Sequence, residues 1–433
     1  MKRSIRMLTA LAASAGLLLS ACGNGGDGGN GRADDENGEN ITLRWWHNSN
    51  TGDGKDYYDQ VAKDFEEANP GVTIEVSAMQ HEDMVTRLEA AWQAGDAPDI
   101  YMERGGGELA DKVDAGLVKD LSDMVPETIE KLGGNVSGWQ IDGQTYGLPF
   151  SLGVVGFWYN TELFDAAGVE PPSTMEELND VTDQLKQAGI DPISVGAGDK
   201  WPAAHYWYYF ALRECSGDVL DEAVTSLDFS DECFVRAGDD LVELVNTEPF
   251  NPGFLTTGAQ AGPTSASGLL ATERVAMELA GHWEPGVMQG LTEDQQGLGD
   301  KLGWFPFPAV SGGEGDPGDA LGGGDAWAVP ATAPDKAVEF VDYLLSDEVQ
   351  KGFAELDMGL PTNPTASEFV ADPALADLLA YRDQAPRVQL YLDTAFGTAV
   401  GGAMNDEIAL VFAGQSSPQG IVDAIQSAVD AQR

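Results

Sequence analysis

The stretch that decides the fold runs from residue 41 to residue 78 and reads ITLRWWHNSNTGDGKDYYDQVAKDFEEANPGVTIEVSA. Its first five residues alternate apolar and polar side chains, as a short strand does. Apolar residues then recur at helical spacing from Tyr58 to Ala68, and Asn69-Pro70-Gly71 ends the helix. Residues 72–78 form the next predicted strand. A strand, a helix and a strand in this order predict parallel pairing with a right-handed crossover.

The same alternation continues along the chain and predicts an α/β fold. At 433 residues the chain is too long for one ordinary core, so we expect two lobes. The further predicted strands are 99–102, 154–159 and 192–195. The further predicted helices are 84–92, 109–113, 174–187, 201–212, 231–245, 335–345 and 405–411.

The N-terminus reads as an export signal. Three basic residues precede an apolar run from Met7 to Leu19, which is short for a membrane span, so we predict a signal peptide over 1–21. The tetrapeptide Leu19-Ser20-Ala21-Cys22 resembles the bacterial lipobox, in which the cysteine carries the lipid. Residues 22–40, rich in Gly, Asn and Asp, then form a flexible linker. We expect a protein anchored through Cys22 on the extracytoplasmic face of the membrane; an unlipidated secreted protein is the alternative.

The remaining cysteines, Cys215 and Cys233, are two in number. Export would place them where disulfides persist, so a bond between them is the first interpretation. Two buried free thiols are the alternative.

Charge and motifs exclude several classes of function. The 72 acidic and 23 basic residues argue against nucleic acid and against anionic lipid as partners, and the acidic excess reads as a solvating surface or as adaptation to a saline habitat. The four histidines have no metal-ligand spacing, and no P-loop or nucleophile-elbow motif is present. We therefore expect no catalytic residue, no metal and no cofactor.

Aromatic residues gather where strands end and loops begin. Sugar rings offer apolar C–H faces that stack on aromatic side chains, and hydroxyls that bind carboxylates, amides and Arg. Any one of these tryptophans could instead pack in a core. The clusters are Trp45-Trp46-His47-Asn48, Trp201, Gly281-His282-Trp283-Glu284-Pro285 and Asp325-Ala326-Trp327.

These clusters, together with four short motifs, resemble the extracellular solute-binding proteins of carbohydrate ABC importers, the family of the maltose-binding protein. The motifs are Ala97-Pro98-Asp99-Ile100, the segment FWYNTELF at 157–164, the segment MELAGHW at 277–283 and Gly359-Leu360-Pro361-Thr362. The resemblance implies a two-lobed periplasmic-binding-protein-like fold with discontinuous lobes, a hinge and a ligand cleft. It places 41–151 plus 322–361 in the N-terminal lobe and 152–321 plus 362–433 in the C-terminal lobe.

The resemblance also implies ligand-binding residues. Glu103 and Arg104 stand where the family has an acidic residue and an Arg on sugar hydroxyls, although an exposed helix-capping pair is the alternative. Trp201 and Trp283 lie near stacking positions of that family. Where the maltose-binding protein has a C-terminal stacking Trp, this sequence has Gly401-Gly402, so the resemblance does not imply that maltose is the ligand.

Three further candidates follow from position. His47 and Asn48 come directly after the first strand, and the carboxyl ends of strands border ligand sites in open α/β sheets. Asp325 follows the flexible Gly322-Gly323-Gly324 and could reach the cleft from a hinge.

The sequence therefore predicts a monomeric binding protein, not an enzyme. It would bind a di- or oligosaccharide outside the cytoplasm and deliver it to the membrane subunits of an ABC importer. A non-sugar solute such as a peptide, polyol or glycerol phosphate ester is the first alternative. A secreted glycosidase or a purely structural surface lipoprotein are the others.

Overall fold

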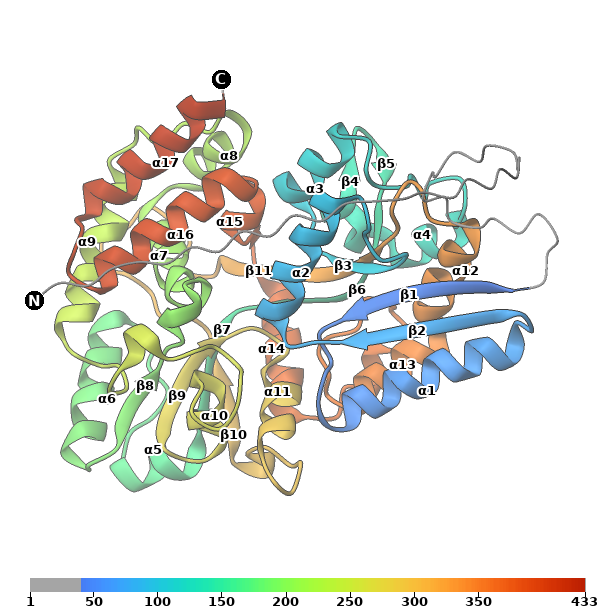
Figure 1. The fold of residues 1–433 in the computed structure, drawn as a ribbon. Coiled ribbons are helices and arrows are strands. Elements are labelled where there is room, and N and C mark those ends of the chain that lie inside the picture. The colour runs from blue at the N-terminus through green and yellow to red at the C-terminus, as the bar shows by residue number, and fades with distance from the viewer. Residues whose placement is uncertain (1–39, 433) are drawn as a thin grey trace, which may run out of the picture. The chain divides into compact units, whose positions relative to one another are not determined.

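Two sets of strands organise the chain, as Figure 1 shows for the computed structural model. The structure describes residues 40–432. The predicted signal peptide 1–21, the lipid-bearing Cys22 and all but the last residue of the predicted linker lie outside the described residues.

The first set is built around the long central strand β11, which pairs with β3 and β6 in antiparallel fashion and with β12 in parallel. Beside it, β1 and β2 form a parallel pair, and an isolated bridge joins Trp45 of β1 to Ile100 just before β3. The strands of this set are β1 (Ile41–His47), β2 (Val72–Ala78), β3 (Tyr101–Glu103), β6 (Gly147–Val154), β11 (Ala320–Ala328) and β12 (Val388–Leu390).

The second set has the strand order β10-β7-β9-β8. Only β8 and β9 are parallel; β7 pairs antiparallel with β9 and with β10. A small hairpin of β4 (Gln140–Ile141) and β5 (Gln144–Thr145) stands apart from both sets. The strands of the second set are β7 (Gly156–Asn160), β8 (Asp191–Ser194), β9 (Val275–Ala280) and β10 (Leu302–Phe305).

Parallel pairing, as predicted from strand and helix alternation, is found for β1–β2, β8–β9 and β11–β12, whereas the other paired strands of residues 40–432 are antiparallel. The central antiparallel pair, β6 and β11, arises because the chain crosses between the two sets of strands instead of always returning through a helix. Only Val155 separates β6 of the first set from β7 of the second, so β6 carries the chain across in one direction. The chain comes back through β11, and the two crossing strands are therefore antiparallel.

Helices surround both sets, and several begin at recognisable caps. The Thr174 side chain accepts a hydrogen bond from the amide of Glu177 to start α6, and Gln80 does the same for the second and third residues of α2. Packed with the first set are α1 (Gly52–Ala68), α2 (His81–Ala94), α3 (Gly106–Asp114), α4 (Pro126–Leu132), α12 (Asp335–Leu344) and α13 (Asp347–Glu355). The remaining helices are α5 (Thr161–Ala167), α6 (Met175–Gln187), α7 (Trp201–Glu214), α8 (Gly217–Ser226), α9 (Cys233–Asn246), α10 (Ala266–Ala271), α11 (Glu284–Leu291), α14 (Pro373–Gln384), α15 (Leu392–Ala395), α16 (Thr398–Phe412) and α17 (Pro418–Gln432).

Each set of strands has its own aromatic core. In the first, the Trp45 ring lies 5.1 Å from Tyr58 and 5.3 Å from Trp327, both edge-on. In the second, α7 is buried all round because α9, α16 and β9 pack against it, which fits its run of aromatic residues at 206–210. Two cores in one chain are what the two-lobed fold requires.

Cys215 and Cys233 are joined by a disulfide, with their Cα atoms 5.1 Å apart. The bond links Cys215, the residue that caps the C-terminus of α7, to Cys233, the first residue of α9. Closing this loop removes freedom from the unfolded chain and stabilises the fold by roughly 3 kcal/mol in the chain-entropy account.

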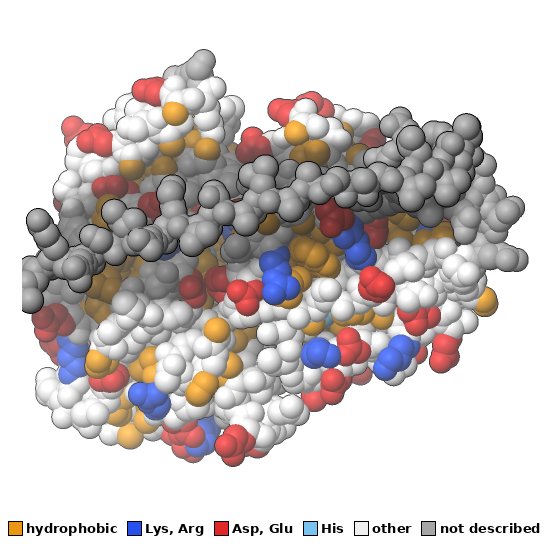
Figure 2. All heavy atoms as spheres, in the orientation of Figure 1, with side chains coloured by type: hydrophobic (Ala, Val, Ile, Leu, Met, Phe, Trp, Pro, Cys, Tyr) orange, Lys and Arg blue, Asp and Glu red, His pale blue; other side chains and the backbone are white. Residues whose placement is uncertain are grey.

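Acidic side chains are scattered over the visible face and do not gather in one patch (Figure 2). Within residues 40–432, no helix is long and apolar enough to cross a membrane.

Candidate functional site

A cavity of about 450 Å³ is lined by residues that follow strands of both sets. The size suits a small organic ligand. Its polar lining includes Asn48, Gln80, His81, Arg104, Gln260, Gln289, Asp325 and Asp393. Its aromatic lining includes Phe150, Trp201, His205, Trp283, Phe353 and Tyr391.

Two tryptophans and a tyrosine form the aromatic wall of this cavity. The ring centres of Trp201 and Trp283 are 6.1 Å apart with the planes at 71°, and Tyr391 lies 6.4 Å from Trp283 at the same angle. Trp201 is the first residue of α7, and its indole Nε1 donates to a carboxylate oxygen of Glu82 on α2, 3.2 Å away. This hydrogen bond joins helices that pack with different sets of strands.

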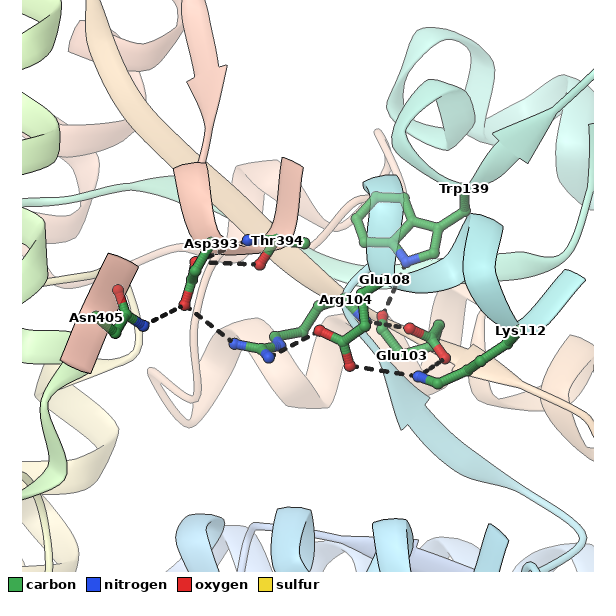
Figure 3. Close-up of polar contacts among 8 residues, drawn as sticks. All are labelled: Glu103, Arg104, Glu108, Lys112, Trp139, Asp393, Thr394 and Asn405. Atoms are coloured by element: carbon green, nitrogen blue, oxygen red, sulfur yellow. Dashed lines mark hydrogen bonds and ion pairs between the residues drawn. The ribbon is translucent and has the colours of Figure 1, made fainter. Parts of the chain in front are cut away.

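Arg104 is the centre of a charged network at the cavity wall (Figure 3). Its Nη2 donates to a carboxylate oxygen of Glu108 at 2.7 Å, and its Nη1 lies 3.8 Å from Asp393. Lys112 Nζ contacts the same Glu108 at 3.3 Å and Glu103 at 2.6 Å. Burial alone would raise the pKa of Glu108, but the adjacent Arg104 and Lys112 lower it to about 2. Glu108 therefore stays ionised around neutral pH, whereas burial raises the pKa of Glu103 above its ordinary value.

Asp325 reaches the cavity from β11 without such partners. Among residues 40–432 its side chain takes part in no hydrogen bond and no ion pair within 4 Å. Burial raises its pKa to about 6, although the positive charge of Arg104 opposes that rise. A half-buried carboxylate in this position is a ready acceptor for a ligand's donors.

Three histidines in the wall are uncharged at neutral pH. Burial lowers the pKa of His205 and of His282 to about 3, and burial together with Arg104 lowers that of His81 to about 4. His282 Nε2 lies 2.8 Å from the Ser151 hydroxyl, and Asn48 Nδ2 lies 3.4 Å from His81 Nδ1. The cavity thus offers neutral hydrogen-bonding rings beside its charged groups.

The structure brings five of the seven predicted ligand-binding residues to one cavity: Asn48, Arg104, Trp201, Trp283 and Asp325. It does not bring His47 or Glu103 there. His47 is fully buried against Trp45 and Tyr58, because alternate residues of β1 face the core. Glu103 is buried too, and its carboxylate faces Lys112, so neither group can accept a ligand hydroxyl in this arrangement.

Sequence reasoning missed Tyr391 and Asp393, which follow β12 and line the cavity. The signal available in the sequence was a Tyr and an Asp directly after a short apolar stretch.

Two glycines make room for the segment that carries Tyr391 and Asp393. A Cβ at Gly323 would lie 2.5 Å from the Tyr391 ring, and a Cβ at Gly401 would lie 2.3 Å from the Asp393 carbonyl. Gly401 therefore lets α16 pack against this segment.

Among residues 40–432, no group of three or more His, Cys, Asp or Glu side chains could hold a metal ion. The chemistry of the cavity is that of stacking and hydrogen bonding.

The sequence model of the bacterial extracellular solute-binding proteins matches residues 48–351. The chain belongs to this family. Similar proteins include an uncharacterised ABC transporter extracellular-binding protein of Pyrococcus horikoshii, which is 23% identical over 76% of this chain and 73% of its own length. The multiple sugar-binding protein of Streptococcus mutans is 22% identical over 79% of this chain and 78% of its own length.

Solved structures share the two-lobed fold. A protein from a study of xylan utilisation by Caldanaerobius polysaccharolyticus superposes with a TM-score of 0.82 at 26% identity, covering 89% of this chain and 99% of that one. A chitin oligosaccharide binding protein superposes with a TM-score of 0.80 at 25% identity, covering 91% of this chain and 99% of that one. This solute-binding protein therefore has the fold that the sequence motifs implied.

Proposed function

We propose that this solute-binding protein captures a di- or oligosaccharide outside the cytoplasm and delivers it to an ABC-type sugar importer. The observation that carries the proposal is the meeting of Trp201, Trp283 and Tyr391 in a cavity that also presents Asn48 and Asp325. Flat rings can cover the C–H faces of a pyranose, while amide and carboxylate groups take up its hydroxyls. Ring faces at two angles could each stack on a separate sugar unit.

The relatives support the same chemistry. The names of similar proteins include a multiple sugar-binding protein and an alpha-glucosides-binding periplasmic protein of Rhizobium meliloti, the latter 27% identical over 42% of this chain. Structures of this fold include a chitin oligosaccharide binding protein.

A glycerol phosphate ester is the chief competing ligand, because a glycerol-3-phosphate-binding protein of Salmonella paratyphi A is 30% identical over 35% of this chain. Phosphate recognition needs clustered Arg side chains or free helix N-terminal amides. Within residues 40–432, Arg104 is the only Arg or Lys that lines the cavity, and Glu108 and Asp393 already share it. The charge of the cavity therefore disfavours a phosphate ester.

The transport cycle we propose uses the two lobes as a clamp. Segments 41–151 plus 322–361 would form one lobe and 152–321 plus 362–433 the other, with the crossing strands β6 and β11 at the hinge. Ligand would favour the closed form by contacting both lobes, and the importer would recognise that form. The protein would act as a monomer without turning over its ligand, held to the membrane through a lipid on Cys22.

Replacing Trp283 by Ala tests the carbohydrate site. The loss of one stacking face should weaken saccharide binding by roughly 1–3 kcal/mol, measured by calorimetry after a thermal-shift screen has identified a saccharide that binds. Trp304→Ala is the matched control, because Trp304 packs on Tyr381 and does not line the cavity. Equal affinities of the wild type and Trp283→Ala would show that Trp283 does not contact the saccharide. The absence of binding by any saccharide would refute the proposal.

A further inference from the structure

A charged cluster beside the cavity carries more negative than positive charge, and three of its members, Arg104, Asp325 and Asp393, line the cavity. The cluster holds four carboxylates and two cationic side chains. The carboxylates are those of Glu103, Glu108, Asp325 and Asp393, and the cations are Arg104 and Lys112. With all groups ionised, the cluster has a net charge of −2, by subtraction of four negative from two positive groups.

The two cations are engaged away from Asp325. Lys112 contacts Glu103 and Glu108, and the Arg104 guanidinium is placed between Glu108 and Asp393, as Figure 3 shows. The three histidines of the wall are neutral, for the reason given above. No cation of residues 40–432 is therefore within ion-pair distance of the Asp325 carboxylate.

An aromatic ring lines the same cavity as this unmatched carboxylate. It is Tyr391, and the negative charge of Asp325 contributes to raising the pKa of its hydroxyl, after the larger effect of burial. Tyr391 also lines the cavity, 6.4 Å from Trp283. A carboxylate combined with aromatic faces is the surrounding that an ammonium group prefers, because it receives both an ion pair and cation–π contacts.

A neutral sugar hydroxyl can donate one hydrogen bond to Asp325 but leaves the net charge of the cluster unchanged. A protonated amine donates up to three hydrogen bonds and also supplies the missing positive charge. In a cavity partly shielded from water the second contribution counts for more than it would in bulk solvent.

We propose that the saccharide bound in this cavity is an amino sugar, and that the Asp325 carboxylate receives its protonated amine. The inference rests on the proposed carbohydrate function and names the class of carbohydrate. It predicts a preference that no neutral or anionic sugar satisfies.

The test compares ligands that differ at a single substituent. Glucosamine, N-acetylglucosamine and glucose carry an ammonium, an acetamide and a hydroxyl at the same carbon, and their β-1,4-linked dimers and trimers and the matching galactose series extend the set. Calorimetry at pH 7 in 50 mM salt should show the amine form bound at least tenfold tighter than its neutral twins in whichever series binds. A neutral twin that binds equally well or better would overturn the inference while leaving the carbohydrate function standing. No binding in either series would likewise overturn the inference, and the carbohydrate function would fall with it only if the thermal-shift screen found no other saccharide that binds.

Asp325→Asn keeps the size of the side chain and removes its charge. The ratio of amine to neutral affinities should fall at least tenfold in this variant, and high salt should reduce the same ratio in the wild type. Asp123→Asn removes one exposed charge that does not line the cavity, and it should preserve the ratio within about twofold, since exposed charges are screened. A ratio that survives Asp325→Asn would place the amine elsewhere and refute the assignment to Asp325. The far-ultraviolet circular dichroism and melting curve of each variant check that it is folded.

Discussion

Glu103 and Glu278 are both carboxylates buried on strands, one in each strand set, but their surroundings differ. Glu103 on β3 accepts a hydrogen bond from Lys112 Nζ at 2.6 Å. Glu278 on β9 has a second carboxylate, Glu284, as its neighbour, and the Ser267 hydroxyl lies 3.1 Å from Glu284 and 3.4 Å from Glu278. In residues 40–432 no cation forms an ion pair with either member of this second pair.

The two regions keep a buried charge tolerable in different ways. Around Glu103 a side-chain cation supplies the compensating charge. Around Glu278 a proton does so: burial raises the pKa of Glu284 to about 8, and burial together with Glu284 raises the pKa of Glu278 well above its ordinary value. The comparison teaches that the first region depends on one lysine, whereas the second depends on the pH of the medium.

The largest effect should come from removing that lysine. Lys112→Met keeps most of the apolar stem and leaves Glu103 buried without its partner, which should lower the free energy of unfolding by about 3–5 kcal/mol. Denaturant titration at pH 7 measures the loss. Lys336→Met is the control, since Lys336 pairs with the exposed Glu339 on α12 and should cost no more than about 1 kcal/mol. Equal, small losses in both variants would show that Glu103 does not rely on Lys112.

The second region should respond to pH. An unfolded glutamate titrates near pH 4.3, whereas Glu284 titrates in the folded protein near pH 8, so the folded state binds more protons in between. The contribution of Glu284 to the free energy of unfolding is fully present below about pH 4. It falls as the pH rises toward 8, by at most about 1.4 kcal/mol per pH unit. Glu284→Gln should remove this part of the pH dependence and make the protein more stable than the wild type at pH 8.

Denaturant titrations from pH 5 to pH 8.5 check the expectation. Glu243→Gln, which removes an exposed carboxylate of α9, should keep the slope of the wild type. If Glu284→Gln and the wild type lose stability in parallel over this range, the pH dependence does not come from the titration of Glu284.

Much of this architecture was predictable from the sequence, and the exceptions have physical reasons. The predicted strand over 72–78 coincides with β2, and the helix predicted over 174–187 begins one residue later because Thr174 is its cap. These elements carry their own periodicity and capping signals. The strand predicted over 154–159 is instead split at Val155 between β6 and β7, because the chain passes there from one set of strands to the other. No local pattern records that change.

The candidate site was predictable to the extent that strand ends mark it. Trp201, Trp283 and Asp325 line one cavity as expected, while His47 turns into the core one residue before Asn48 reaches the cavity. A shift of one residue on a strand reverses the direction of the side chain, and the sequence does not state which residue faces inward. Tyr391 was missed because its approach depends on Gly323, more than sixty residues away in the chain.

The smallest effect is expected at a carboxylate that water already stabilises. Asp221 forms a two-pronged ion pair with Arg387, with contacts of 2.6 and 2.7 Å, but 64% of the Asp221 side chain is exposed. Asp221→Asn should therefore lower the free energy of unfolding by at most about 1 kcal/mol in 0.1 M NaCl. In 1 M NaCl, where charges are screened beyond about 3 Å, the variant and the wild type should unfold at nearly the same denaturant concentration. If Asp221→Asn lost as much free energy of unfolding as Lys112→Met, the short distance of an ion pair and not its burial would determine its contribution to stability. The contrast between Glu103 and Glu278 would then need another cause.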